Sequence, residues 1–382
     1  MAPPPPPALM NDDVIGEILV RLPPADPSCL FRASLVCKPW RGLLLDPAFL
    51  RSYRAFHRTP PVLGFFHDTQ SHGTFIPRFV PVTGAHRVPQ PPPGPCSGSG
   101  SGFWTLDCRH GRVLLHNLAT SSLVVWDPIT CGHQDITHPV NEYGEESEFL
   151  TAAVLCASDG CSHLECRGGP YLVVFAGGDF FGEDDDFVAW VSVYSSEAGA
   201  WSARVSVHPG PISDSGEVMG RSLLAGGALY FTLEEGQRIL KYDLVGCVLS
   251  VIRPPAVLAG DMVLVTAEDG GLGAAVVKNY SLHLWSRRVG TDGIGKWVQG
   301  RVIELDMMIT IAIGDPTTKL DIVGFAEGAG SVFVRHGLFA VELKSGRVRK
   351  IGKRGDFSAI FPFVSFYTPG TSFMPIDIFT QS

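Results

Sequence analysis

Near the N-terminus the apolar residues recur at helical spacing. Between residues 12 and 22 they form the i, i+4, i+8 stripe of an amphipathic helix, together with the neighbours of that stripe. Asn11 is a candidate N-cap, and Pro23 ends the helix. Asp26 and Pro27 then predict a second helix start, because proline suits the first helical position. The apolar members of the first stripe are Val14, Ile15, Ile18, Leu19 and Leu22.

A second apolar set extends to residue 50, across Pro39 and the turn at Asp46-Pro47. Pro39 marks either the end of the second helix or the start of a third. Three short helices in about 45 residues cannot bury all of these side chains among themselves, so we expect them to need a partner surface, in another protein or elsewhere in the chain. The set comprises Leu30, Phe31, Ala33, Leu35, Val36, Cys37, Trp40, Leu43, Leu44, Phe49 and Leu50.

Beyond residue 60 the pattern changes to paired strands. Residues 111–127 and 227–243 align without a gap as glycine, apolar strand, loop, apolar strand, aromatic residue and Asp. Residues 330–342 form a shorter copy, and 187–207 and 274–289 show the same two-strand pattern. A repeat of roughly 40 to 50 residues is typical of β-propeller blades. The second strands centre on Trp126, Tyr194, Tyr242, Trp285 and Val341.

The ends of this region predict how the propeller closes. Residues 61–83 and 357–367 would share one blade, which gives about six blades and removes exposed sheet edges. A leucine-rich repeat is the alternative, but no period of about 20 to 29 residues is present. We therefore predict a three-helix module followed by an all-β, propeller-like domain. The expected divisions are a Pro-rich tail at 1–8, helices at 9–57, the propeller at 61–370 with a flexible Pro/Gly/Ser loop at 89–102, and a tail at 371–382.

Composition and charge narrow the possible functions. The chain has 382 residues, of which 43 are Gly and 30 are Pro, a proportion that suits strands and turns. Its net charge is −8, and no basic stripe is present, which argues against nucleic-acid binding. The N-terminal sequence lacks the features of a secretory signal, and no apolar run is long enough to span a membrane. We expect a reducing cytoplasmic or nuclear environment with free cysteines.

Three separated motifs in residues 9–54 resemble the F-box. They are Ile-Leu-x-Arg-Leu-Pro at 18–23, Val-Cys-Lys-x-Trp-Arg at 36–41 and Asp-Pro-x-Phe at 46–49. The sequence departs from the family at Leu9-Met10, where Leu-Pro is usual. In addition, residues 124–130 resemble the Asn-Pro-x-Thr turn of the propeller-like domain that follows the F-box in many plant F-box proteins, with Asp127 in place of Asn.

The resemblance implies a partner and a role. F-boxes dock onto the Skp-type adaptor of a cullin-RING ubiquitin ligase, so the chain would be a non-catalytic substrate receptor that holds an unidentified target protein on its propeller. Leu22, Pro23, Leu30, Phe31, Val36 and Trp40 would be buried against the adaptor. The full adaptor-binding set implied by the resemblance is Leu9, Val14, Ile15, Ile18, Leu19, Leu22, Pro23, Leu30, Phe31, Leu35, Val36, Cys37 and Trp40.

Other candidate sites are weaker. Zinc could bind a group of four residues, but paired Cys-x-x-Cys knuckles are missing, so a loop of free thiols is the favoured interpretation. The glycines at 270–273 precede a strand-like segment, which predicts a β-turn rather than a dinucleotide loop. The acidic run at 183–186 could bind calcium but is more typical of a solvated loop. The four candidate zinc ligands are Cys156, Cys161, His163 and Cys166.

We therefore expect no cofactor, no metal and no catalytic residue. Two alternatives to a ligase subunit stay open. One is an F-box-like interaction scaffold that assembles no ligase, and the other is a propeller enzyme. The enzyme would need His, Asp or Tyr side chains that converge at the central channel, as in other sites assembled by folding.

Overall fold

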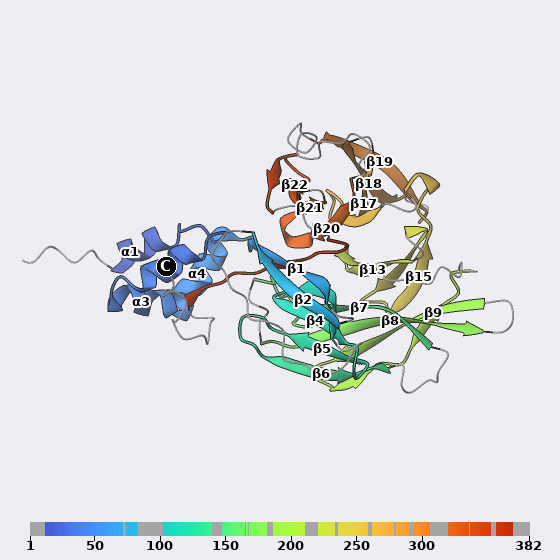
Figure 1. Cartoon of the computed structure of the whole chain (residues 1–382), viewed down its shortest axis with the longest axis horizontal. Helices are drawn as coiled ribbons and strands as arrows, with labels where there is room; N and C mark the ends of the chain where they lie inside the picture. Colours follow the sequence, from blue (N-terminus) through green and yellow to red (C-terminus); the bar gives the residue numbers. More distant parts are fainter. Residues whose placement is uncertain are drawn as a thin grey trace, which may run out of the picture.

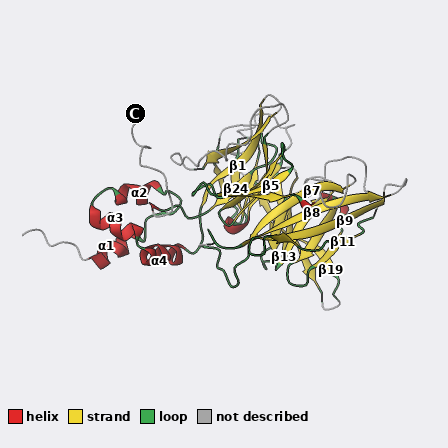
Figure 2. Ribbon diagram, turned by 90° about the horizontal axis from the view of Figure 1, so that it is seen from below, coloured by secondary structure: helices red, strands yellow, loops and turns green. Residues whose placement is uncertain are grey.

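In a computed structural model of the full chain, the protein consists of a helical module and a β-sheet domain (Figure 1). The helices lie at one end of the molecule, and the strands form the larger body beside them (Figure 2). The described residues are 12–71, 74–82, 102–139, 147–164, 166, 168–181, 186–210, 221–233, 236–258, 262–278, 280–290, 293–305, 320–335, 337–352 and 357–369. The predicted tails, the N-cap Asn11, most of the 89–102 loop and residues 183–185 of the acidic run lie outside these residues.

The helical module contains four helices where the sequence predicts three. Pro39 starts a helix rather than ending one, and Asp46 caps the additional helix by accepting a hydrogen bond from the backbone N–H of Ala48 at 2.8 Å. Proline in the first turn favours both starts, because its missing N–H has no helical partner there. The helices are α1 (Asp12–Leu19), α2 (Ser28–Ser34), α3 (Lys38–Leu45) and α4 (Pro47–His57).

The β domain is a six-bladed propeller of antiparallel sheets, as predicted. Blade 1 closes the ring with strands from both ends of the domain, β1 (Val62–Ser71), β2 (Thr74–Pro81) and β24 (Phe361–Val364). Blade 2 has β3 (Phe103–Arg109), β4 (Arg112–Asn117), β5 (Ser122–Trp126) and β6 (His133–Thr137). Blade 3 has β7 (Ser147–Cys156), β8 (Tyr171–Phe181), β9 (Asp186–Ser195), β10 (Ala200–Trp201) and β11 (Val205–Val207).

The remaining three blades each have four strands in sequence order. Blade 4 has β12 (Ser222–Ala225), β13 (Ala228–Leu233), β14 (Arg238–Asp243) and β15 (Val248–Ile252). Blade 5 has β16 (Val263–Thr266), β17 (Leu272–Lys278), β18 (Ser281–Val289) and β19 (Gly295–Glu304). Blade 6 has β20 (Ile322–Ala326), β21 (Ser331–Val334), β22 (Phe339–Glu342) and β23 (Val348–Lys350). Two short 3-10 helices are also present: η3 (Ala256–Leu258) lies between β15 and β16, and η4 (Glu327–Ala329) lies between β20 and β21.

Apolar side chains pack between neighbouring blades, and strand alternation explains how. Successive side chains of a strand point to opposite faces. On β1, Phe65 lies in the core shared with blade 6, whereas Phe66 lies in the core shared with blade 2. Both aromatic rings are fully buried. A strand that is buried on both faces therefore reads as a continuous apolar run, which is the pattern of the sequence here.

The repeated aromatic-Asp pair has a structural cause. Asp127 follows the third strand of blade 2, and its Oδ1 accepts hydrogen bonds from the backbone N–H groups of Ile129 at 2.8 Å and Thr130 at 3.3 Å. Asp243 makes the equivalent turn in blade 4, with Gly246 N at 2.7 Å. These side chains replace backbone acceptors in the turn between the third and fourth strands. The glycines at 270–273 lie in the β-turn region before and at the start of β17, as predicted.

Candidate functional site

The helical module leaves several large apolar side chains exposed to solvent. Ile18 on α1 is 50% exposed, and Val36 in the connection between α2 and α3 is 63% exposed. Exposed apolar side chains that gather on one small module are typical of protein-binding surfaces. The expectation that these helices cannot bury all of their apolar residues is therefore confirmed. The exposed apolar side chains of the module also include Leu45 and Phe56. We call the four that belong to the predicted adaptor-binding set the apolar surface: Val14, Ile18, Leu35 and Val36.

The other residues of the predicted adaptor-binding set occupy different environments. Leu22, Phe31 and Trp40 are half-buried, Pro23 and Cys37 are exposed, and Leu9 lies outside the described residues. Three members belong to the interior of the module, where they pack with Leu44 and Tyr53. A side chain such as Leu30, which is 1% exposed, offers no surface to a partner. We therefore reassign Ile15, Leu19 and Leu30 from adaptor contact to the core of the module.

The helices are joined to the propeller through the segment after β24. Phe366 is buried in the helical core, with its ring centroid 6.0 Å from that of Tyr53 in an edge-on arrangement. Tyr367 lies 5.2 Å from Phe31, measured between ring centroids. The backbone N–H of Ser365 donates to the carbonyl of Pro61, in the connection between α4 and β1, at 3.1 Å. Phe31 thus contacts this chain's own propeller segment, a contact that the sequence motif did not indicate.

Hydrogen bonds also position the helical core. The Tyr53 hydroxyl donates to the Leu22 carbonyl at 2.9 Å, and His57 Nε2 lies 2.9 Å from the Val20 carbonyl oxygen. Burial raises the pKa of Tyr53 well above its usual range, so the hydroxyl keeps its proton and remains a donor. Both bonds hold the segment after α1 against α4.

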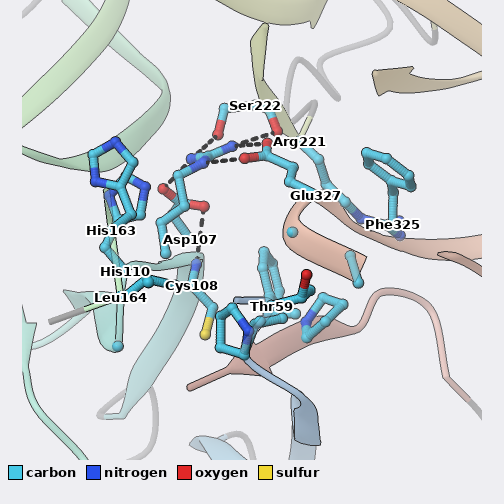
Figure 3. A pocket seen from close by; sticks show the side chains of 18 of the residues that line it. Thr59, Asp107, Cys108, His110, His163, Leu164, Arg221, Ser222, Phe325 and Glu327 are labelled. Carbon is cyan, nitrogen blue, oxygen red and sulfur yellow. Dashed lines mark hydrogen bonds and ion pairs between the residues drawn. The ribbon is translucent and has the colours of Figure 1, made fainter. Parts of the chain in front are cut away.

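A cavity of about 340 Å³ lies where the helical connection meets the propeller axis (Figure 3). Its wall includes Thr59, Asp107, Arg221 and Glu327, which come from the α4–β1 connection and from three different blades. Because the propeller brings the inner strands of all blades to one axis, residues more than 100 positions apart in the sequence meet here.

Charged side chains that line this cavity form a connected network. Arg109 pairs with Asp107 and with both carboxylate oxygens of Glu327, and it donates to the Ser222 hydroxyl at 2.9 Å and the Ser222 carbonyl at 3.0 Å. Asp107 also accepts from Val154 N at 2.8 Å. The network connects blades 2, 3, 4 and 6. It was not predicted from the sequence, because no local pattern relates these positions.

Burial and ion pairing shift the pKa values of the groups in and beside this network. Burial raises the pKa of Asp107 to about 6, although the Arg109 charge opposes this shift. Burial alone would lower the pKa of Arg109, but the charges of Asp107 and Glu327 raise it above its usual range. Burial also lowers the pKa of Arg221 to about 10. The Asp107 and Glu327 carboxylates are both paired with the Arg109 guanidinium.

A second polar cluster lies beside the cavity, in the loop between β7 and β8. It contains the four residues considered as zinc ligands, and their sulfur and nitrogen atoms all lie within 4.8 Å of one another. The sequence spacing made a metal site the less favoured interpretation, but the fold brings all four side chains together. Figure 3 shows His163 of this loop stacked on His110, with ring centroids 4.1 Å apart. The members are Cys156, Cys161, His163 and Cys166.

A helical module with an exposed apolar surface, fixed to a closed six-bladed propeller, defines a two-part binding protein. Comparison with known families supports this description. A family model described as F-box protein AT5G49610-like, beta-propeller, matches residues 104–370, and an F-box domain model matches residues 8–52. The chain belongs to this family of F-box proteins with a C-terminal β-propeller, as the motifs predicted. F-box domains generally bind Skp1-type adaptors, and proteins of this family are typically non-catalytic.

The matching solved structures have low sequence identity and low TM-scores. A nidogen/laminin complex is 12% identical with a TM-score of 0.39, covering 78% of this chain and 95% of that chain. A luciferin-regenerating enzyme is 10% identical with a TM-score of 0.34, covering 82% and 97%. The extracellular domain of the one-component system BT4673 from B. thetaiotaomicron is 11% identical with a TM-score of 0.32, covering 73% of this chain but 42% of that chain. These likenesses carry no functional argument.

No curated protein matches the sequence. Among the described residues, no helix combines the length and the apolar character that a membrane crossing requires.

Proposed function

We propose that this chain is the substrate-recognition subunit of an SCF-type cullin-RING ubiquitin ligase. Its F-box would bind a Skp-type adaptor, and through it a cullin, while its propeller would hold a target protein. The chain would perform no bond chemistry of its own. It would act by proximity, because a bound target meets the ubiquitin-charged enzyme at high effective concentration.

The apolar surface on the F-box helices carries this proposal. Val14 and Ile18 are four residues apart on α1, so they lie on one face of that helix, beside the buried stripe of Ile15 and Leu19. Leu35 and Val36 add a second exposed apolar pair in the connection to α3. A protein module covers such a surface when it binds an apolar groove or helix.

The junction between the helices and the propeller supports the delivery of a target. The α4–β1 connection contains Pro60 and Pro61, which restrict the backbone, and the segment after β24 packs into the helical core. Two separate parts of the chain therefore hold the module against the propeller. A fixed orientation between adaptor and target limits the lysines that the ligase can reach.

The adaptor affinity of a double variant tests the proposal. Ile18→Asp combined with Val36→Asp removes two half-exposed apolar contacts and introduces charge. Burying the exposed part of each side chain contributes about 1–2 kcal/mol, so together with the charge we expect at least about 3 kcal/mol, or about a 100-fold loss of adaptor affinity. Affinity is measured by titration of the purified adaptor onto the full chain.

Val289→Asp is the matched control, because Val289 lies at the end of β18 and is 62% exposed, almost as much as Val36. Its adaptor affinity should equal that of the wild type. Undiminished binding by the double variant would refute the assignment of the apolar surface. If the wild-type chain captures neither adaptor nor cullin, the ligase proposal is wrong.

The alternatives are separated by the same experiments. An interaction scaffold would bind the adaptor without recruiting the cullin. An enzyme would require unoccupied acid, base or metal-binding groups at the propeller axis, whereas the described carboxylates Asp107 and Glu327 are engaged by Arg109. The observed network therefore favours the non-catalytic role.

We also propose that the protein works in the cytoplasm or the nucleus. Eight cysteines lie among the described residues, and all of them are free thiols in the structure. Reducing compartments keep such thiols unpaired. Fluorescence imaging of the tagged full chain tests this placement, and accumulation in the secretory pathway would contradict it.

A further inference from the structure

We propose that the loop between β7 and β8 binds a structural zinc ion through Cys156, Cys161, His163 and Cys166. These residues provide three sulfur atoms and one imidazole nitrogen, the Cys₃His donor set of structural zinc sites. Cys156 ends β7, and the other three lie within the connection to β8, which begins at Tyr171. A single loop thus supplies all four ligands.

The distances fit one tetrahedral ion. With Zn–S bonds near 2.3 Å and Zn–N bonds near 2.0 Å, ligand atoms around zinc lie about 3.5 to 3.8 Å apart. Cys161 Sγ and Cys166 Sγ are 3.3 Å apart, and His163 Nδ1 is 3.3 Å from Cys166 Sγ. Every ligand atom lies within 4.8 Å of the others. Changes of up to about 1 Å in these separations would therefore complete the coordination sphere.

A disulfide explains the cluster less well. A disulfide bond requires a sulfur separation near 2.05 Å and uses only two cysteines. Here three sulfurs and an imidazole converge, and the 3.3 Å contact between Cys161 and Cys166 is not a covalent bond. A metal uses all four groups, whereas a disulfide would leave Cys156 and His163 without a role.

Neighbouring groups already orient the proposed ligands. The backbone N–H of Cys156 donates to His110 Nδ1 at 3.1 Å, and the His110 ring stacks on His163. The backbone N–H of His163 points at Cys161 Sγ, 3.4 Å away, a contact that stabilises a thiolate. Such outer groups fix ligand geometry in metal sites. His110 therefore acts as a positioning residue for two of the four ligands.

A buried cation lies next to the loop. Arg112 is 5% exposed, and its guanidinium donates to the carbonyl oxygens of Cys166 at 2.8 Å and Gly169 at 2.6 Å. Zinc binding would release one proton from each of the three thiols, and the resulting site of one Zn²⁺ and three thiolates would carry a net charge of −1. The positive charge of Arg112 offsets this charge in a poorly solvated environment.

The site would also hold the F-box in place. Leu164, between two of the ligands, packs against the core of the helical module together with Trp40 and Leu43. Leu164 and His163 both line the cavity, and Figure 3 shows them on the same side of it. The described residues of this loop form only turns and bends, with no helix or strand. Zinc would therefore fix the propeller loop on which the F-box rests.

Metal analysis of the full chain, purified without a polyhistidine tag, tests this proposal. We expect about one zinc ion per chain by mass spectrometry of the elements. Cys161→Ser and Cys166→Ser should each lower zinc content at least about tenfold, and His110→Ala should weaken zinc affinity about 10-fold or more. His163→Cys should retain zinc, because it replaces one ligand with another. The matched control is the triple variant of exposed cysteines Cys37→Ser, Cys131→Ser and Cys247→Ser, which should keep its zinc.

Cobalt keeps the proposal testable if a ligand variant fails to fold. Wild-type chain stripped with a chelator and loaded with Co²⁺ should show the intense visible absorption of tetrahedral cobalt bound by thiolates. The stripped chain should also regain slow hydrogen exchange in α3, which carries Trp40 and Leu43, when zinc is restored. The proposal is overturned if the wild type contains no more zinc than Cys166→Ser, if cobalt gives no such band, or if the intact mass shows a disulfide among these cysteines.

Discussion

Phe366 provides a sharp test of how the F-box is held on the propeller. This side chain belongs to the propeller domain by sequence but is buried in the helical core, where it is 2% exposed. Truncation of a buried Phe to Ala costs about 3–5 kcal/mol. The helical module, Asp12–His57, would have a total stability of about 2–7 kcal/mol at about 0.05–0.15 kcal/mol per residue. The cost of truncating this one side chain is therefore comparable to the total stability of the helical module.

We expect Phe366→Ala to release or unfold the helices while the propeller stays folded. Hydrogen exchange measured by mass spectrometry should show faster exchange in peptides from α1 to α4 and unchanged exchange in β3 to β6. The control is Phe363→Ala, three residues earlier on β24, where the ring is fully buried between blades 1 and 2 and lies 5.9 Å from Phe66. This control should loosen blade 1 instead.

Unchanged helix protection in Phe366→Ala would refute the reasoning, because it would mean that the module is stable without its propeller contact. Equal effects of the two variants on all peptides would also contradict it. In that case the helices and the propeller would unfold as one cooperative unit.

Three further predictions concern the propeller and are measured by urea unfolding. Burial raises the pKa of Asp68 to about 6 from the ordinary value of 3.8, despite its hydrogen bonds from Thr105 at 2.7 and 3.0 Å. The folded state therefore binds more protons between these pH values, and the ionised carboxylate destabilises it above them. Relative to Asp68→Asn, the free energy of unfolding of the wild type should fall by up to about 3 kcal/mol between pH 4 and pH 7.5. Asp127→Ala should cost about 1 kcal/mol, because two backbone N–H groups lose their acceptor. Gly177→Ala should cost at least about 2 kcal/mol, because its Cβ would lie 2.2 Å from Trp190 Cζ2 in a packed core.

Matched variants accompany these measurements. Asp135→Asn makes the same change at an exposed position of β6, and an equal effect at both positions would contradict the burial argument for Asp68. Gly42→Ala in α3 meets nothing within 4 Å and should be neutral or stabilising, since alanine favours helices. If Gly177→Ala is equally harmless, the close packing of Trp190 does not restrict this site.

Several features of the fold could be predicted from the sequence because they depend on local patterns. The helical stripe around Ile15 and Leu19 and the turn at Asp127 correspond to α1 and to the end of β5. The closure of blade 1 by residues near both ends of the domain was also correct, since β1 pairs with β24. The additional helix α4 was missed, because the Asp46-Pro47 pair was interpreted as a turn rather than as a helix start.

The division of the F-box residues could not be predicted in this way. Ile15 and Ile18 have similar side chains on the same helix, but one is buried and the other is half exposed. A motif contains both kinds of residue, because internal packing and partner binding use the same apolar side chains. The positions of the neighbouring helices and of Phe366 decide which side chains remain available to a partner.

The sequence by itself determined the helical module, the repeated strands and the family, since periodicity and turn residues act over a few neighbouring positions. Only the tertiary structure decided which apolar residues are exposed, how the network of Arg109 and Asp107 joins four blades, and that Cys156 meets Cys161, His163 and Cys166. Such arrangements depend on the path of the backbone in three dimensions. Closing the ring of blades and folding back the β7–β8 loop bring these groups within a few ångströms, which sequence spacing does not specify.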